Sequence, residues 1–276
     1  MPLLTLHLLS IEPGTNPKQF ADQLRSSRDV SFDVVVASRP RGPIVRPDFL
    51  DKQRLLNTPW NLLLLLQPRS SSSFNGPLQP LFPNVIRDEY FIYVGIPSKL
   101  LATFPARDAQ LKREAATAPL TGALEEAQRK PSSQNLELSP DLLSFMNELF
   151  PKHNKPVTML NLLHFHPGGK PQYYKYGQAF IPVAGKRGGN AKIVGNVVSP
   201  PASAPSDARG AANRPETDWW NEISIVHYPS IRHFCDMLAG EDYQEINSKY
   251  RLKALRDTFL LCTTEFDVED EQRPKL

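Results

Sequence analysis

Apolar runs of strand length recur in the C-terminal part of the chain, separated by proline and glycine. They occupy 158–165, 191–198, 220–228 and 258–266. The first is closed by Pro167-Gly168-Gly169 and the third by Pro229-Ser230, which are typical strand breakers. These runs predict four strands.

Helical spacing of apolar residues lies between the first and second runs and between the third and fourth. Residues 171–184 predict a helix with Tyr173, Gly177, Phe180 and Ala184 on one face, which Pro182 should kink or end early. Residues 231–238 and 243–254 predict two shorter helical stretches. The order β-α-β-β-α-β indicates an α+β, ferredoxin-like domain at 157–270. One face of its sheet has no helical cover and needs a partner.

The same region carries a family resemblance. Its residues are Tyr228-Pro229-Ser230, Met237-Leu238, Gly240-Glu241-Asp242-Tyr243-Gln244-Glu245, Arg251 and Ala254-Leu255-Arg256-Asp257-Thr258. They resemble the domain-of-unknown-function family 1330 of the dimeric α+β barrel superfamily, alongside EthD-type proteins and small cofactor-free monooxygenases. The resemblance implies a small aromatic or polyketide-like ligand held between sheet and helices, a His or Tyr as general acid or base, and no cofactor.

The N-terminal part repeats the pattern. Leu4 to Gly14 parallels Thr158 to Gly168, so that His7 corresponds to Asn161, and Trp60-Asn61 parallels Trp220-Asn221. Further elements of this copy are predicted at Val34-Val35-Val36 and Tyr90 to Ile96 (strands), at Phe20, Ala21 and Leu24 (first helix), and at Leu78, Leu81, Phe82, Val85 and Ile86 (second helix).

Two ferredoxin-like repeats are therefore predicted, at 1–105 and 157–270, with a partly helical linker at 106–150. Each sheet would cover the open face of the other, giving an α+β barrel as a pseudo-dimer within one chain. The alternatives are chance similarity between leucine-rich strands, and a homodimer formed through the C-terminal sheet. If the barrel is intramolecular, the seam between the halves is the expected place for a site.

Charge and composition narrow the class of protein. The 32 basic and 29 acidic residues give a net charge of +3 without a basic patch, which argues against nucleic-acid binding. No apolar run is long enough to cross a membrane, and two cysteines indicate a reducing compartment, so a cytoplasmic location is expected. Proline clusters at 68–83 and 200–215 predict mobile loops.

The candidate site residues are polar or aromatic positions on the predicted strands. His164, His227 and Tyr228 are the candidate catalytic residues, and Asn161, His7, Trp220 and Asn221 the candidate substrate-binding residues. Each also has an ordinary structural explanation, as a buried polar group with a local partner or as a packing position. His164 and His166 share a strand face, but without a defined third ligand they predict no metal site.

Two functions remain open. The first is binding of a small apolar or aromatic molecule, with or without cofactor-independent chemistry of the monooxygenase or isomerase kind. The second is a non-catalytic module for self-association or protein interaction. The first function needs a closed apolar cavity with a few convergent polar groups, and a barrel interior packed solid with Leu, Ile and Phe would exclude it.

Overall fold

The protein is an α+β structure built on one antiparallel sheet of eight strands. The computed structural model describes residues 1–70, 76–210 and 214–269. The strands are β1 (Leu3–Ile11), β2 (Phe32–Val45), β3 (Leu62–Pro68), β4 (Ile86–Gly95), β5 (Val157–Phe165), β6 (Asn190–Val197), β7 (Glu222–Tyr228) and β8 (Leu255–Glu265). The helices are α1 (Pro17–Ser26), α2 (Lys52–Asn57), α3 (Ser98–Glu114), α4 (Ala123–Glu126), α5 (Pro140–Leu149), α6 (Lys170–Gly185), α7 (Ile231–Ala239), α8 (Glu241–Ile246) and α9 (Leu252–Ala254). The prediction of an α+β protein is confirmed.

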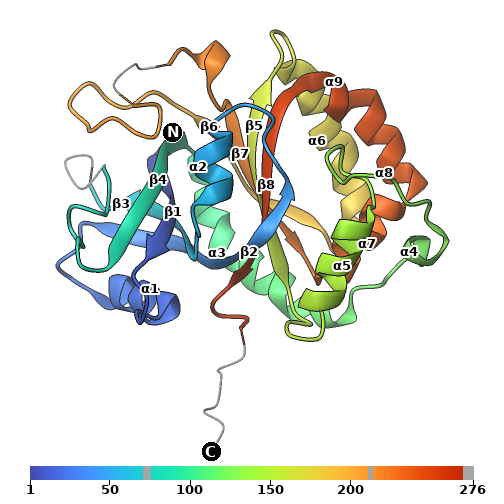
Figure 1. Cartoon of the computed structure of the whole chain (residues 1–276), viewed down its shortest axis with the longest axis horizontal. Helices are drawn as coiled ribbons and strands as arrows, with labels where there is room; N and C mark the ends of the chain where they lie inside the picture. Colours follow the sequence, from blue (N-terminus) through green and yellow to red (C-terminus); the bar gives the residue numbers. More distant parts are fainter. Residues whose placement is uncertain (71–75, 211–213, 270–276) are drawn as a thin grey trace, which may run out of the picture.

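The strand order is β1-β3-β2-β8-β5-β7-β6-β4, and it closes into a barrel because β4 also pairs with β1. Within β1–β4 the order along the sheet is fourth, first, third, second. Within β5–β8 it is the same. The second strand of each half pairs with the fourth strand of the other, through β2 with β8 and β4 with β6. Figure 1 shows the two halves side by side, with most helices gathered outside the C-terminal half.

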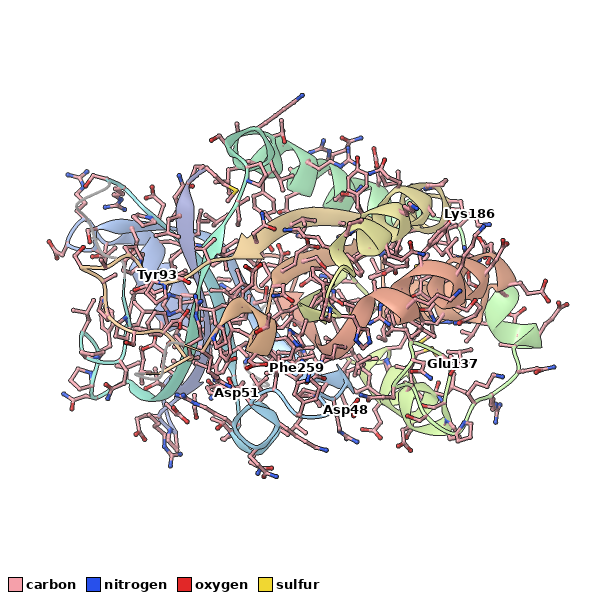
Figure 2. The ribbon with its side chains drawn as sticks, turned by 90° about the horizontal axis from the view of Figure 1, so that it is seen from above. Asp48, Asp51, Tyr93, Glu137, Lys186 and Phe259 are labelled. Carbon is pink, nitrogen blue, oxygen red and sulfur yellow. The ribbon has the colours of Figure 1, made fainter. Side chains whose placement is uncertain are left out.

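Three hydrophobic clusters follow from the alternation of side chains along the strands. One draws on all eight strands, including Leu6, Leu160 and Phe259, and fills the barrel interior. Phe259 accordingly lies near the middle of the molecule in Figure 2. A second cluster packs α1 on the outer face of the N-terminal half, and a third packs α5, α6, α7 and α8 on the outer face of the C-terminal half. The interior is therefore occupied by side chains of the protein itself.

The two seams of the barrel differ. The β2–β8 seam has six paired positions, from Ser38–Glu265 to Val45–Leu260, whereas the β4–β6 seam has only Val94–Val197 and Gly95–Asn196. Beyond this short seam, the proline-rich segment that follows β6 forms hydrogen bonds to the edge of β4 in place of β6. The Val198 amide donates to the Tyr93 carbonyl at 3.0 Å, and the Ala208 amide donates to the Phe91 carbonyl at 2.9 Å.

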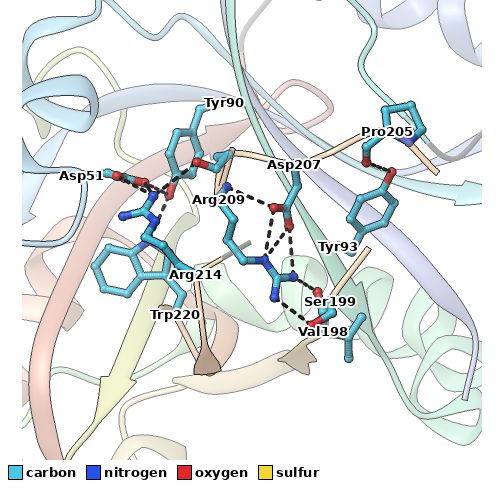
Figure 3. A network of polar contacts seen from close by, with 11 residues as sticks. Asp51, Tyr90, Tyr93, Val198, Ser199, Pro205, Asp207, Arg209, Arg214 and Trp220 are labelled. Carbon is cyan, nitrogen blue, oxygen red and sulfur yellow. Dashed lines mark hydrogen bonds and ion pairs between the residues drawn. The ribbon is translucent and has the colours of Figure 1, made fainter. Parts of the chain in front are cut away.

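Side chains hold that segment in place (Figure 3). Arg209 pairs with Asp207, and both are buried. Arg214 pairs with Asp51 at 2.9 Å and stacks over the ring of Trp219 at 4.2 Å. Within the predicted mobile loop at 200–215, described residues 200–210 form a loop that the Arg209–Asp207 pair and the bond from the Ala208 amide to β4 hold against the barrel. Residues 211–213, and 71–75 in the first proline cluster, lie outside the described residues.

One prediction for the N-terminal part is wrong. Described residues 76–85 form turns rather than a second helix, although Leu78 is buried. Pro77, Pro80 and Pro83 explain this, since interior proline removes helical hydrogen bonds. The segment 106–150, predicted as a partly helical linker, contains the end of α3, α4 and α5, and α3 packs against β6 of the C-terminal half. The domain boundaries themselves stay a prediction.

The helix α6 runs from Lys170 to Gly185 and continues through Pro182 instead of ending early. Tyr176, Phe180 and Ala184 form its buried face. Across the described residues, every helix is too short or too polar to span a membrane.

Candidate functional site

A cavity of about 800 Å³ lies on the outer face of the C-terminal half of the sheet, beneath α6. Its floor consists of residues of β5, β6, β7 and β8, and its walls come from α3, α6, α7, α8 and the π-helical segment Asn247–Arg251. Ligand sites in proteins commonly measure about 300–1,000 Å³ and are largely apolar with a few convergent polar groups. The expected place for a site was the seam between the halves, and the barrel interior is packed with side chains. The cavity lies instead between sheet and helices, where the family resemblance implies a ligand.

Aromatic rings form one wall of the cavity. Tyr173, Tyr176 and Phe180 follow each other along α6, with ring centroids 5.3 Å and 5.7 Å apart. Their spacing of three and four residues puts them on one helical face. Tyr174 is 68% exposed at the cavity rim, so the run of tyrosines is divided between a buried wall and the surface.

Gly177 leaves a gap in this wall. It lines the cavity between Tyr173 and Phe180, and a Cβ added there would meet nothing within 4 Å. Glycine lowers helix stability relative to alanine by roughly 1 kcal/mol, so its position opens space at a cost to the helix.

The polar groups of the floor come from alternate strand positions. Asn161 on β5 lies opposite Ser224 on β7, and both line the cavity. The Asn161 side chain donates one hydrogen bond, to the Met159 carbonyl at 3.2 Å. Glu222, two residues before Ser224, shares its face. Burial raises the pKa of the Glu222 carboxyl to about 7, and the nearby Lys170 charge opposes this shift.

Tyrosine hydroxyls add neutral hydrogen-bonding groups. Tyr228 and Tyr243 also line the cavity, and the hydroxyls of Tyr176 and Tyr243 are 3.4 Å apart. Burial raises the pKa of the Tyr173, Tyr176, Tyr228 and Tyr243 hydroxyls, and the positive charge of Arg251 opposes the shift at each of them. All four therefore stay protonated at neutral pH and can donate hydrogen bonds.

Arg251 is the least expected residue of the site. Its side chain is 3% exposed, it lines the cavity, and Nη2 is buried without a hydrogen-bond partner. It ends the π-helical segment, a rare geometry that occurs frequently at functional sites. The sequence held two signals for it. Arg251 is one of the residues that carry the family resemblance, and it follows Asn247 by four residues and Tyr243 by eight, which puts a charged residue on the buried face of that helical stretch.

The candidate catalytic residues do not converge. Tyr228 faces the cavity, whereas His164 and His227 lie on the opposite face of the sheet. His227 pairs with Thr158 in the β5–β7 ladder, six residues from His164, which is roughly 20 Å at 3.4 Å per residue. His164 contacts the Trp219 carbonyl at 2.6 Å through Nδ1. Burial lowers the pKa of His227 to about 3 and also lowers that of His164, so both are neutral at physiological pH.

The candidate binding residues divide in the same way. Asn161 lies in the cavity, Trp220 packs in the barrel interior and donates from Nε1 to the Tyr90 hydroxyl, and Asn221 accepts from the Phe165 amide at 2.8 Å. His7 lies on the outer face of the N-terminal half, where Glu89 contacts Nδ1 at 2.6 Å and Thr5 contacts Nε2 at 2.7 Å.

A charged cluster at one end of the barrel offers the only group of three acids with metal-site spacing among the described residues: Asp108, Glu265 and Asp267. Lys112 lies within 2.5–2.6 Å of all three, and buried Lys192 contacts Asp108 and Glu265. The lysines neutralise the carboxylates and occupy the space between them, so the cluster is a structural ion-pair network rather than a metal centre.

Comparison with known proteins leaves the family open. No family model and no curated protein matches the chain, so membership of the domain-of-unknown-function family 1330 stays a prediction. Among solved structures, the chain is similar to the RPA0582 protein of unknown function from Rhodopseudomonas palustris. That match has 22% identity and a TM-score of 0.35, and it covers 46% of this chain and 93% of the other. A methylated form of RPA0582 gives 20% identity, a TM-score of 0.35 and coverage of 51% and 97%. Scores this low carry no argument about function.

Proposed function

We propose that the C-terminal half of this protein binds a small, largely apolar aromatic molecule in the cavity beneath α6. The observation that carries the proposal is the cavity itself: about 800 Å³, walled by Tyr173, Tyr176 and Phe180, with few polar groups on its floor. Flat aromatic rings pack favourably against such a wall, because offset and edge contacts between rings add to the burial of apolar area.

Gly177 provides the test. Gly177→Leu should project a side chain into the cavity and block the space beside the aromatic wall, while Gly177→Ala adds only a Cβ where nothing lies within 4 Å. Binding of naphthalene-based probes is measured by saturation-transfer NMR and isothermal titration calorimetry. The alanine variant should bind like the wild type, and the leucine variant should lose at least tenfold in affinity. Equal binding by both variants would place the ligand elsewhere and overturn the proposal.

We also propose that the architecture is an internal duplication of a ferredoxin-like unit, closed into an intramolecular α+β barrel. Besides the common strand order, irregularities recur at matching positions. The first strands shift register at Ser10/Ile11 and at His164/Phe165, and the second strands at Val34/Val36 and Ala191/Ile193. Independent strands have no reason to share such bulges, which are conserved features within families.

Two asparagines support the same proposal. The Asn61 backbone amide donates to the Leu9 carbonyl, and the side-chain Oδ1 of Asn61 accepts from the Ile11 backbone amide at 2.9 Å. The Asn221 backbone amide donates to the Leu163 carbonyl, and the side-chain Oδ1 of Asn221 accepts from the Phe165 backbone amide at 2.8 Å. The same pair of bonds thus joins the start of the third strand to the end of the first strand in each half.

The self-association alternative loses its main support in this arrangement. It required an open sheet face in the C-terminal half, and that face packs against strands of the N-terminal half in the barrel interior. Light scattering of the purified protein should therefore give the mass of one chain. The two cysteines, Cys235 and Cys262, are buried free thiols, which fits the proposed cytoplasmic location.

Catalysis is a second candidate function, and Glu222 favours it. A cavity carboxyl with a pKa of about 7 exchanges protons readily at physiological pH, as a general acid or base must. Chemistry without a cofactor would then be proton transfer of the isomerase kind. The test is deuterium incorporation from D₂O into a bound ligand, followed by NMR; Glu222→Gln should abolish it without loss of binding.

A further inference from the structure

We infer that the ligand of this cavity is an aromatic carboxylate whose negative charge pairs with the guanidinium of Arg251. The inference rests on the proposed function and specifies its ligand class.

The first argument is the isolation of Arg251. Its side chain is almost fully buried and lines the cavity, and Nη2 has no hydrogen-bond partner. Within the described ranges, the Arg251 side chain forms neither an ion pair nor a hydrogen bond. An arginine stays protonated in proteins, so it cannot avoid this cost by losing its charge.

The other buried arginines have carboxylate partners, which Arg251 lacks among the described residues. Arg187 is 2% exposed and pairs with Asp236 and Asp242. Arg209 is 6% exposed and pairs with Asp207. The protein thus compensates its other deeply buried guanidinium groups with carboxylates of its own. At Arg251 the compensating carboxylate is absent among the described residues, and the space beside it is a cavity.

The third argument is the chemistry around Arg251. The Arg251 charge acts on the pKa of the Tyr173, Tyr176 and Tyr243 hydroxyls. These hydroxyls are neutral, so they can donate hydrogen bonds to an anion but carry no charge that neutralises Arg251. The other charged residues of the lining are Arg107, Lys170 and Lys192, all cations, and the single acid Glu222. The cavity therefore favours an anion.

The geometry of the groups selects a carboxylate joined to an aromatic ring. A guanidinium presents a planar fork of donors that matches a carboxylate in a bidentate pair. Among the other cations of the lining, Arg107 and Lys170 are exposed and Lys192 is already paired with Asp108 and Glu265. Arg251 is thus the buried cation of the described lining that has no carboxylate of its own. The rings of Tyr173, Tyr176 and Phe180 accommodate the flat apolar part of the ligand.

The test uses two probes that differ only in charge, 1-naphthoate and 1-naphthamide, titrated calorimetrically into wild-type protein at pH 6.5. A charge-assisted bidentate contact predicts that 1-naphthoate binds roughly tenfold to a hundredfold more tightly. Arg251→Met should abolish this preference while leaving the affinity for 1-naphthamide within about threefold, and Arg251→Lys should retain part of it.

The outcomes separate the two levels of the proposal. Equal affinity of wild-type protein for both probes would overturn the carboxylate inference and leave aromatic binding intact. Preference retained in Arg251→Met would also overturn it, since another group would then hold the anion. Binding of neither probe would count against aromatic binding itself. Urea midpoints of both variants establish that each is folded during the titrations.

Discussion

The two halves have the same strand order, but the outer face of the N-terminal half is filled and that of the C-terminal half contains a cavity. In the N-terminal half, His7 projects from the middle of the first strand and is closed in by Glu89, which also accepts from the Leu78 and Gln79 amides at 2.9 and 2.8 Å. In the C-terminal half, the matching Asn161 makes one bond to its own strand and otherwise faces the cavity.

The covering elements explain the difference. α1 has 10 residues and α6 has 16, and the described part of the segment between β3 and β4 contains no helix, whereas α7, α8, the π-helical segment and α9 connect β7 to β8. Turns can lie close against a sheet and cover it, as the turns at 76–85 do with the buried side chain of Leu78. Longer helices bridge over the sheet and leave room beneath. A common frame therefore supports a filled face and a hollow one, according to what covers it.

The largest effect is expected from removing Glu89, which closes the outer face of the N-terminal half. Glu89→Ala would leave the His7 ring and two backbone amides without their buried partner, so the free energy of unfolding should fall by about 3–5 kcal/mol. Urea denaturation measures this. Glu12→Gln, which removes a partly exposed partner 3.6 Å from Arg87, is the matched control and should change stability by less than about 0.5 kcal/mol. A small effect of Glu89→Ala would mean that the N-terminal face is not locked by this network.

The hollow face should respond in the opposite direction. Arg251→Met replaces a buried, unpaired charge by an apolar side chain, so the ligand-free protein should become more stable by about 2 kcal/mol. The same variant should lose carboxylate binding, a trade between stability and function. The measurement is the urea midpoint without ligand. Destabilisation by Arg251→Met would indicate that the guanidinium has an internal partner and would contradict its assignment to a ligand.

The shared frame predicts equal effects at matched positions. Asn61→Ala and Asn221→Ala each remove a hydrogen bond to the end of the first strand of their half, so each should cost about 1–2 kcal/mol, and the two costs should agree within about 0.5 kcal/mol. Asn57→Ala, which removes an exposed contact to Gln53, serves as the control. Strongly unequal costs would argue against equivalent roles in the two halves.

The smallest expected effect concerns pH. The pKa of Glu222 is about 7 in the folded protein and near 4.5 when unfolded, so the folded state holds the proton more tightly, and stability falls as pH rises between these values. The groups that interact with it are Lys170 and Tyr173 on α6. Glu222→Gln should thus stabilise the protein by about 1 kcal/mol at pH 8.5 and have little effect at pH 4.5, measured by urea denaturation. An identical gain at both pH values would assign the effect to packing instead.

Much of the fold was accessible from the sequence because the strands have distinct patterns. The run Leu62 to Leu66 and the run after Thr158 both fall inside observed strands, and the 154-residue offset between His7 and Asn161 agrees with their matching places in the sheet. The prediction of a second N-terminal helix is wrong because apolar residues of the turns, among them buried Leu78 and exposed Leu81, recur at helical spacing. The three prolines of that segment were the stronger signal.

The site was predictable only in part. Asn161 and Tyr228 were named, and alternation along the strands implies that His164 and His227 face the other way, since each differs from a cavity residue by an odd number of positions. What the sequence did not contain was which face is hollow. That depends on the height of α6 above the sheet and on the course of the chain near Arg251, and both arise from tertiary packing.

The closed barrel also sets an order of events during synthesis. β8 is the last strand in the chain, yet it lies between β5 and the distal part of β2. While the ribosome is still making residues 255–265, β5 and the distal part of β2 each have an unpaired edge. The N-terminal half alone offers no strand that pairs with this part of β2. We therefore expect the pairing of β8 with β2 and β5 to be a late, long-range step of folding, during which the edge of β2 can meet wrong partners.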